Sequence, residues 1–341
     1  MKSIHLILVL LLGSTLLSAQ TTNSKFKIAN KIHLEGDAGW DYLYSDDQAG
    51  RLYVSHGTMV QVIDEAKGEL IGTISETPGV HGIAIASDLN KGYISCGRDT
   101  SVVVFDIKTL KVISKITVTG LNPDAILFDP FSKKVFVYNG RSNDATVIDA
   151  LTDKVVATIP LEGKPEFSAT DGKGKVFVNI EDVSKLCQIN ATTLKVEKVW
   201  PLAPGEEPTG LAFDAKTKRL FSACGNEMMI VIDAETGNIV AKVPTGKGVD
   251  GTTFDPELGF IYVANGEGTM TVIKEVNKDE FKVVETFPTQ SSARTITSNK
   301  ITHHIYLSAA DYETIPQDAN TRARRKIIPN SFVILDIEPM K

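Results

Sequence analysis

The chain has 341 residues, of which 42% are hydrophobic and 23% charged, and its formal net charge at pH 7 is −6. An acidic chain without a basic and aromatic stripe disfavours nucleic acid and anionic lipid as partners. No apolar run after residue 20 is long enough to cross a bilayer, so we expect no membrane span. We expect a monomer.

The first twenty residues, MKSIHLILVLLLGSTLLSAQ, have the pattern of a secretory signal peptide. Lys2 provides the basic start, an apolar run extends from Leu6 to Leu12, and small residues precede Gln20. We expect cleavage after Ala19 or Gln20 and a periplasmic or secreted mature chain. The alternative, a membrane anchor, fits a longer apolar core better than this one.

Three cysteines, Cys96, Cys187 and Cys224, leave at least one free thiol in an exported chain. Their spacing matches no zinc pattern. We expect all three to be small buried hydrophobic side chains.

A repeat of about forty residues organises the rest of the chain. Six glycines mark it at intervals of 40 to 43 residues: Gly39, Gly79, Gly120, Gly163, Gly205 and Gly246. A seventh unit starts near Gln290. Each unit contains four short runs rich in Val, Ile, Phe and Thr, with Gly, Asp, Asn and Lys turns between them. Four strands per unit, repeated seven times, predict an all-β, seven-bladed β-propeller.

The seventh unit has only three of these runs, at 294–298, 304–310 and 331–337. The run FKIANKIHL at 26–34 resembles a fourth strand and precedes the first unit. We therefore expect a single propeller domain over 21–341, with a last blade formed by 290–337 plus 26–34. Such closure leaves no open sheet edge.

The runs LYVSHG, FVYNG and IYVANG resemble the signature of the YVTN-type propellers, also called the YncE-like family. The resemblance covers 26–337 and implies seven blades around a central channel. It implies no particular activity, because propellers host unrelated functions.

In a propeller the innermost strand of each blade lines the channel. The residue that opens each inner strand should therefore form a ring at the channel mouth, made of Asp41, His81, Asp124, Glu166, Thr209, Asp250 and Arg294. Crowded carboxylates repel one another and need a cation or arginines nearby. The alternative is a wet rim that tolerates polar residues. The later aspartates Asp129 and Asp255, each before a proline, are expected to shape turns.

A second ring is expected at the ends of the second strands, on the same face. Its members are His56, Arg98, Asn139, Arg141, Asn179, Glu181, Asn226, Asn265 and Glu267. Glu206 or Glu207 could lean over the mouth beside the neutral Thr209. The asparagines followed by glycine could equally serve turn geometry alone.

The two rings together predict a polar funnel with His81, Asp124, Glu166 and Asp250 as tentative metal ligands. Oxygen ligands favour Ca²⁺, Mg²⁺ or Mn²⁺, and imidazole would also admit Zn²⁺. The funnel residues we expect to meet a ligand are Asp41, His56, His81, Arg98, Asp124, Asn139, Arg141, Glu166, Asn179, Glu207, Asp250, Asn265 and Arg294.

One long insertion, 311–330, interrupts the last unit on the same face and reads as a loop without clear structure. It carries Arg322, Arg324, Arg325 and Lys326, so it could act as a lid or bind an anionic group. The alternative is a surface strap paired to the acidic rim.

Three functions remain open at this point. The first is a module that binds a small polar ligand or an ion in the funnel. The second is a divalent-metal-dependent hydrolase, with a metal in the channel as in propeller lactonases. The third is a scaffold for protein partners. The chain has no Gly-x-Ser-x-Gly elbow, phosphate-binding loop, dinucleotide fingerprint or haem-attachment motif.

Overall fold

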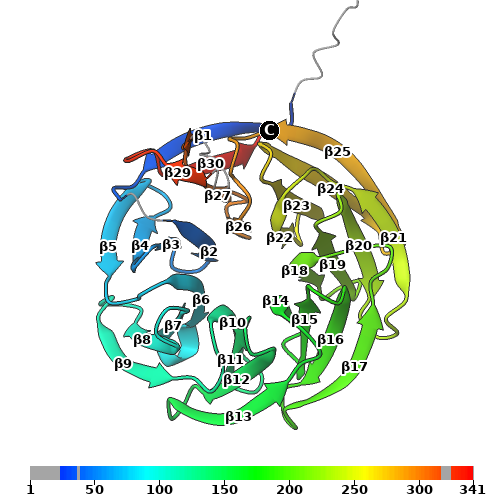
Figure 1. The fold of residues 1–341 in the computed structure, drawn as a ribbon. Helices are drawn as coiled ribbons and strands as arrows, with labels where there is room; N and C mark the ends of the chain where they lie inside the picture. The colour runs from blue at the N-terminus through cyan, green and yellow to red at the C-terminus, as the bar shows by residue number, and fades with distance from the viewer. Residues whose placement is uncertain (1–23, 37–38, 316–323, 341) are drawn as a thin grey trace, which may run out of the picture.

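The computed structural model describes residues 24–36, 39–315 and 324–340. Seven four-stranded antiparallel sheets form a ring around a central channel (Figure 1), which confirms the expected seven-bladed propeller. The blades, from the innermost strand outward, are β2 (Trp40–Asp46), β3 (Arg51–His56), β4 (Met59–Asp64), β5 (Glu69–Ile74); β6 (Val80–Ala86), β7 (Lys91–Cys96), β8 (Ser101–Asp106), β9 (Val112–Thr117); β10 (Pro123–Asp129), β11 (Lys134–Asn139), β12 (Asp144–Asp149), β13 (Lys154–Pro160); β14 (Pro165–Thr170), β15 (Lys175–Ile180), β16 (Lys185–Asn190), β17 (Lys195–Pro201).

The remaining blades are β18 (Pro208–Asp214), β19 (Arg219–Cys224), β20 (Met228–Asp233), β21 (Ile239–Pro244); β22 (Val249–Asp255), β23 (Phe260–Asn265), β24 (Thr269–Asn277), β25 (Glu280–Pro288); and β26 (Ile296–Ser298), β27 (Ile305–Ala309), β30 (Val333–Pro339), β1 (Phe26–His33). The one helical turn among the described residues is the 3₁₀ segment Ser87–Leu89. No helix in this part of the chain is long and apolar enough to span a membrane.

The apolar runs of the repeat become the middle strands of each blade, because these strands are covered on both faces by neighbouring blades. In β3 every residue after Arg51 is buried, and β11 and β23 show the same pattern. The outermost strands are more exposed, and in β5 only Ile74 is buried. The core is therefore a set of hydrophobic layers between blades.

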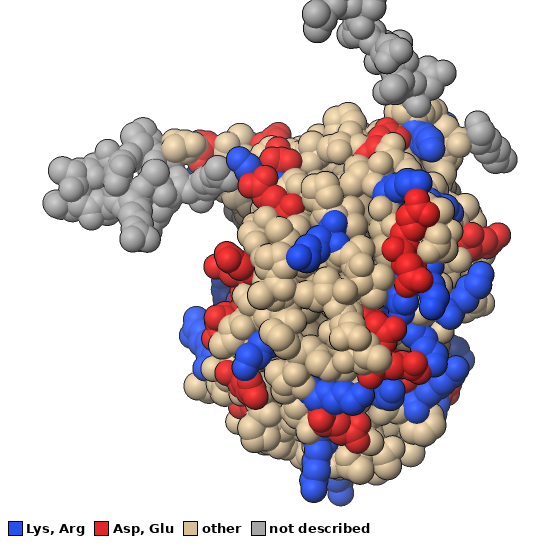
Figure 2. Space-filling view, turned by 90° about the vertical axis from the view of Figure 1, so that its right-hand side faces the viewer, with Lys and Arg blue, Asp and Glu red and all other residues tan. Residues whose placement is uncertain are grey.

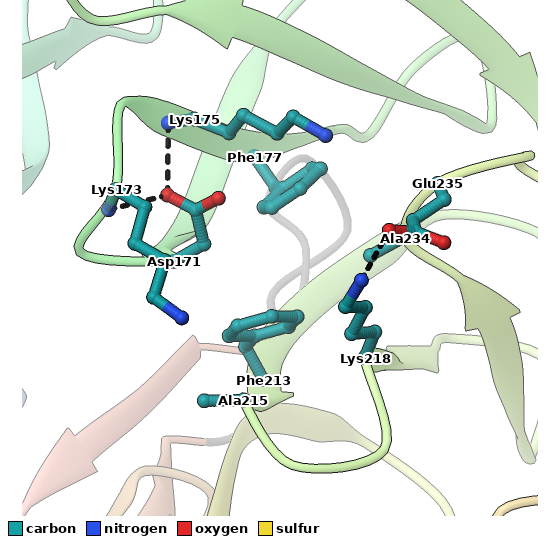
Figure 3. A pocket seen from close by; sticks show the side chains of 9 residues that line it. All are labelled: Asp171, Lys173, Lys175, Phe177, Phe213, Ala215, Lys218, Ala234 and Glu235. Atoms are coloured by element: carbon teal, nitrogen blue, oxygen red, sulfur yellow. Dashed lines mark hydrogen bonds and ion pairs between the residues drawn. The ribbon is translucent and has the colours of Figure 1, made fainter.

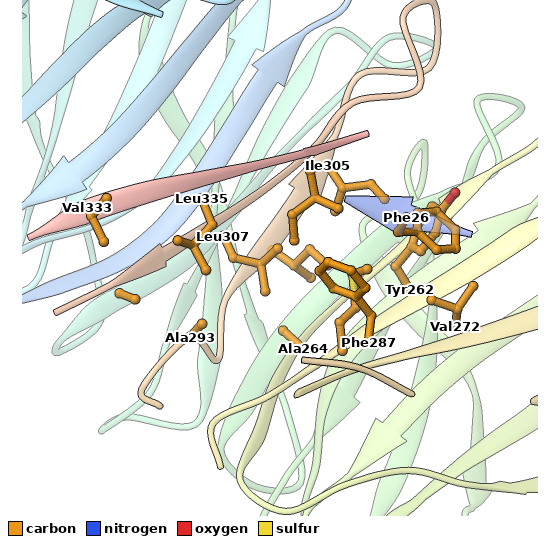
Figure 4. Close-up of a cluster of buried hydrophobic side chains, with 14 residues drawn as sticks. Phe26, Tyr262, Ala264, Val272, Phe287, Ala293, Ile305, Leu307, Val333 and Leu335 are labelled. Carbon is orange, nitrogen blue, oxygen red and sulfur yellow. The ribbon is translucent and has the colours of Figure 1, made fainter. Parts of the chain in front are cut away.

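The N-terminal strand closes the ring, as the incomplete seventh unit predicts. β1 pairs antiparallel with β30 from Phe26 opposite Pro339 to His33 opposite Val333. Phe26 packs edge-on against Tyr262 and Phe287 of the sixth blade, at ring-centroid distances of 5.8 and 6.3 Å (Figure 4). This strand thus joins the last two blades through backbone pairing and aromatic packing.

The insertion in the last blade differs from the expected structureless loop. Its described ends form a two-stranded antiparallel hairpin, β28 (Tyr312–Ile315) with β29 (Arg324–Ile327). Tyr312 lies 6.0 Å from Trp40 between ring centroids, so the hairpin is anchored to the first blade. Arg322 and the tip at 316–323 lie outside the described residues, as does the expected signal peptide at 1–20.

The turn aspartates and the cysteines have the expected roles. Asp129 accepts hydrogen bonds from the backbone N–H and hydroxyl of Ser132, and Asp255 accepts two from the backbone of the next turn. Cys96, Cys187 and Cys224 are buried free thiols, and burial raises the pKa of each to about 12.

Acidic and basic side chains are interspersed over the face seen in Figure 2.

Candidate functional site at the channel mouth

The inner strands place their ring residues at one end of the channel. In six blades the ring residue follows a buried first residue of the strand, as Asp41 follows Trp40, and Arg294 lies just before β26. The pairing register between the first and second strands shifts at this point, for example between Trp40 and Leu43. Such an irregularity redirects a side chain out of the sheet.

Three ring residues converge into one cluster. His81 Nδ1 lies 2.7 Å from Asp41 Oδ2 and 3.5 Å from Asp124 Oδ1. One ligand atom from each of the three lies within 4.8 Å of the other two, a spacing that could hold a metal ion. Hydroxyls of the second strands fix the backbone here, because Ser55 Oγ accepts from Asp41 N–H at 2.9 Å and Ser95 Oγ donates to the carbonyl of Asp124.

The electrostatics of this cluster favour a bound cation. Burial, followed by the charge of Asp41, raises the pKa of Asp124 to about 7. Burial lowers the pKa of His81, but the hydrogen bond to Asp41 and the charge of Asp124 outweigh it, so the net shift is upward. Bound protons therefore offset part of the negative charge that a metal ion would offset in this cluster.

Glu166 pairs with a lysine and lies outside the three-residue cluster. Lys164 Nζ lies 2.6 Å from Glu166 Oε1 and also pairs with Glu181. The lysine is thus shared between two carboxylates. Lys164 lowers the pKa of Glu166, but burial and the charge of Asp124 have the larger effect and raise it to about 8.

Asp250 is likewise paired and stands apart from the three-residue cluster. Arg294 Nε donates to Asp250 Oδ2 at 2.6 Å. Burial and the charge of Asp41 still raise the pKa of Asp250 to about 6. The structure therefore groups Asp41 with His81 and Asp124, whereas sequence reasoning grouped His81 and Asp124 with Glu166 and Asp250.

Several expected funnel residues lie inside the blades instead. His56 is 1% exposed, with its ring 4.2 Å from that of Phe332 and its Nδ1 2.8 Å from Gln61 Oε1. The fully buried asparagines support strand and loop backbone or neighbouring hydroxyls: Asn139, Asn179 and Asn265. Thr209 is also buried, and its hydroxyl donates to the carbonyl of Val249. These residues lie within the blades, and none of them lines the funnel cavity.

The funnel itself is a cavity of about 690 Å³. Asp41 and His81 line it together with three arginines, Arg98, Arg141 and Arg294. Arg98 and Arg141 are exposed. This combination of a half-buried acidic cluster and an arginine rim suits a cation within the cluster and an anionic group at the rim.

The loop with Glu206 and Glu207 and the second-ring residues Asn226 and Glu267 lie at the rim. Glu206 and Glu207 are exposed, and Asn226 holds their loop by accepting from Glu206 N–H and donating to Pro204 O. Glu267 is exposed beside a neighbouring hollow of about 560 Å³ that also contacts Arg294 and Tyr312.

Sequence reasoning missed an aromatic contact across the channel. The rings of Tyr42 and Phe167, from the first and fourth blades, lie 4.3 Å apart between centroids and are tilted by 32°. Burial and then the charges of Asp124 and Glu166 raise the pKa of Tyr42. The sequence contains a signal for this contact, because an aromatic residue directly follows Asp41 and Glu166 in the chain.

A smaller hollow of about 180 Å³ lies between the fourth and fifth blades (Figure 3). Phe177 and Phe213 line it, and Lys218 pairs with Glu235 at its edge. The Asp171 carboxylate is occupied by the backbone N–H groups of Lys173 and Lys175. Since most of these polar groups already have partners, the channel mouth is the stronger candidate site.

Comparison with known protein families and with curated proteins gives no match. Solved structures do match, among them one described as hydrazine synthase of Kuenenia stuttgartiensis, with a TM-score of 0.52 and 18% identity. The match covers 72% of this chain and 98% of that chain. At this identity the likeness shows the propeller fold alone.

Proposed function

We propose that the protein binds a divalent cation through Asp41, His81 and Asp124 and, above it, a small anionic ligand. The observation that carries this proposal is the convergence of one imidazole and two carboxylates within 4.8 Å at the channel mouth. Two carboxylates and an imidazole suit Mn²⁺ or Zn²⁺, and the oxygen ligands also suit Ca²⁺ or Mg²⁺.

The ligand class follows from the rim. Arg98, Arg141 and Arg294 line the same cavity as the acidic cluster. Guanidinium groups bind carboxylate and phosphate through paired hydrogen bonds. A cation in the cluster would offset the negative charge of the ring, so an anion could approach it from the funnel.

We also propose that the protein is an exported, YncE-like propeller. The leader pattern at 1–20 supports export, and the near-signature runs in the second strands support the family. Mass spectrometry of the N-terminus of the mature protein tests the first point, because processing would leave a chain that starts at Gln20 or Thr21.

A second candidate function is hydrolysis in the same funnel. It is favoured by Glu166, whose carboxyl has a pKa raised to about 8 by burial and by Asp124. A carboxyl that titrates near neutral pH can give or take a proton during a reaction. Esters and lactones with an anionic group are the substrates to assay, with Glu166→Gln as the inactive variant.

Calorimetric titration of the purified protein with Mn²⁺, Zn²⁺, Ca²⁺ and Mg²⁺ tests the main proposal. We expect one saturable site for at least one of them, lost in Asp41→Asn and His81→Ala and retained in Glu206→Gln, which changes an exposed carboxylate. The absence of saturable binding in the folded wild-type protein would overturn the proposal. A scaffold function would leave partner binding unchanged in the two ligand variants.

A further inference from the structure

A separate cavity occupies the channel on the other side of the Tyr42–Phe167 pair. It measures about 430 Å³, and all seven inner strands or the turns that follow them contribute to its wall. Tyr42 and Phe167 line this cavity, whereas Asp41 and His81 line the funnel. The aromatic pair therefore separates an acidic compartment from a second compartment of different chemistry.

The wall of this lower compartment is largely apolar. Ile83, Ile85, Ile126 and Phe128 line it, and the aromatic pair forms its inner end. The volume falls within the range of small-molecule sites, which are typically lined by apolar side chains with a few polar groups. A hydrated ion gains nothing here, but an apolar ligand body would lose contact with water.

One cationic side chain lines the cavity, that of Lys300. Its ammonium is held by neutral oxygens only: Thr253 Oγ1 at 2.9 Å, Ser298 O at 2.9 Å and Ser298 Oγ at 2.7 Å. It forms no ion pair with any carboxylate in the described parts of the chain. Asp47, Asp255 and Glu65 act on it from farther away, and burial lowers its pKa to about 8, so it still carries its charge at pH 7.

Among the described residues this charge has no carboxylate within ion-pair distance, although Asp47, Asp255 and Glu65 act on it from farther away. An anionic group entering the cavity would supply a direct partner for the ammonium. The hydroxyl of Thr253, which lines the cavity and accepts from Lys300, can also donate to that anion, because a hydroxyl both donates and accepts.

A second polar group in the cavity wall is Thr252. Its side chain is 6% exposed, and its Oγ1 is buried with no hydrogen-bond partner among the described residues. The Thr252 hydroxyl is turned away from the cavity space and offers no contact to a ligand. Lys300 is therefore the charged anchor of the chamber, and Thr253 beside it is the polar side chain that shares its hydrogen bond.

We propose that this lower compartment binds a small amphipathic carboxylate, with its carboxylate on the Lys300 ammonium and its apolar body against Ile83, Ile126 and Phe128. The site is independent of the cation cluster. The ligand class is a medium-chain fatty acid or an acid of similar size, since a short polar anion would leave the apolar wall uncovered.

Titration calorimetry with decanoate, decan-1-ol and acetate, below micellar concentrations and with a chelator present, tests this proposal. We expect saturable decanoate binding, at least tenfold weaker binding of decan-1-ol, and no saturable binding of acetate. Lys300→Met should weaken decanoate binding at least tenfold and leave decan-1-ol unchanged.

Thr297→Trp provides a second variant that leaves Lys300 in place. Thr297 lines the cavity from β26, and its side chain is partly exposed, so an indole there should fill the chamber and abolish binding of both probes. Glu206→Gln, which changes an exposed carboxylate at the rim of the funnel, should bind decanoate as the wild type does. Decanoate affinity that is unchanged in Lys300→Met and Thr297→Trp, or no saturable decanoate binding by the wild type, would overturn the proposal.

Discussion

His81 Nδ1 lies 2.7 Å from Asp41 Oδ2, although the two residues are 40 positions apart in the chain. The contact joins equivalent positions of neighbouring blades. Arg294 and Asp250, 44 positions apart, form the same kind of contact between the sixth and seventh blades. In both pairs the cationic side chain meets the carboxylate of the preceding blade, so these two contacts link neighbouring blades at the channel mouth.

The first prediction concerns the imidazole of this contact. Without Asp41, burial should dominate, so Asp41→Asn should lower the pKa of His81. An NMR titration of the His81 ring protons in the presence of a chelator measures this shift. His304, whose pKa is raised by its own partner Asp336, serves as the internal control and should not move. An unchanged His81 titration would contradict the importance of the contact.

The second prediction concerns pH and stability. The pKa of Glu166 is raised to about 8 in the folded protein, above its usual value of 4.5. The folded state therefore holds a proton that the unfolded chain has lost, and the resulting stability is full below pH 4.5 and disappears as pH rises through 8. Relative to Glu166→Gln, the wild type should lose on the order of 1 to 3 kcal/mol of unfolding free energy between pH 5 and pH 9.

Urea unfolding at several pH values measures this difference. Glu267→Gln removes an exposed carboxylate on the same face and should follow the wild-type pH dependence. Parallel pH profiles for wild type and Glu166→Gln would show that burial of Glu166 does not control its protonation.

The third prediction concerns the aromatic pair across the channel. Phe167→Ala should reduce the unfolding free energy by about 2 to 4 kcal/mol, because it removes a large ring packed between two compartments. Phe131→Ala provides the matched control, since that ring is 55% exposed and should cost no more than about 0.5 kcal/mol. A double-mutant cycle with Tyr42→Ala should give a coupling of about 0.5 to 1.5 kcal/mol, and strict additivity would contradict direct stacking.

The fourth prediction concerns closure of the ring. Phe26→Ala should cost about 3 to 5 kcal/mol, because the ring is 2% exposed and packs between the last two blades. Ile28→Ala lies on the same strand, but its side chain is 36% exposed and should cost much less. Chemical denaturation of both variants measures the difference. Equal losses would mean that backbone pairing of β1, and not the Phe26 contact, closes the ring.

Most of the fold can be predicted from the sequence because the chain is a repeat. A period of about forty residues, with four strand-like runs per unit, determines the seven blades and the position of each inner strand. It also separates the two aspartates of NPDAILFDP: Asp129 caps a turn through Ser132, whereas Asp124 opens the strand at the channel. Both roles follow from position within one repeat, because local turn chemistry and strand order are encoded locally.

The sequence predicts the residues of the candidate site only in part, because the site depends on which side chains approach one another across blades. Lys164 lies two residues before Glu166, and the repeat gives no reason to single it out. Its ion pair with Glu166 nevertheless separates that carboxylate from the three-residue cluster. Asn139 and Asn265 are polar, so the sequence predicts that they face the funnel. Both are buried in their own blades, where they donate hydrogen bonds to neighbouring threonines.

The sequence by itself determined the seven blades, the N-terminal strand that closes them and the face on which the polar ring lies, since these follow from a period and from strand patterning. Only the tertiary structure decided that Asp41, His81 and Asp124 converge and that Tyr42 meets Phe167 across the channel. The physical reason is that strand register and the shift at the start of each inner strand set side-chain direction, and ring closure then sets the distances between residues three repeats apart.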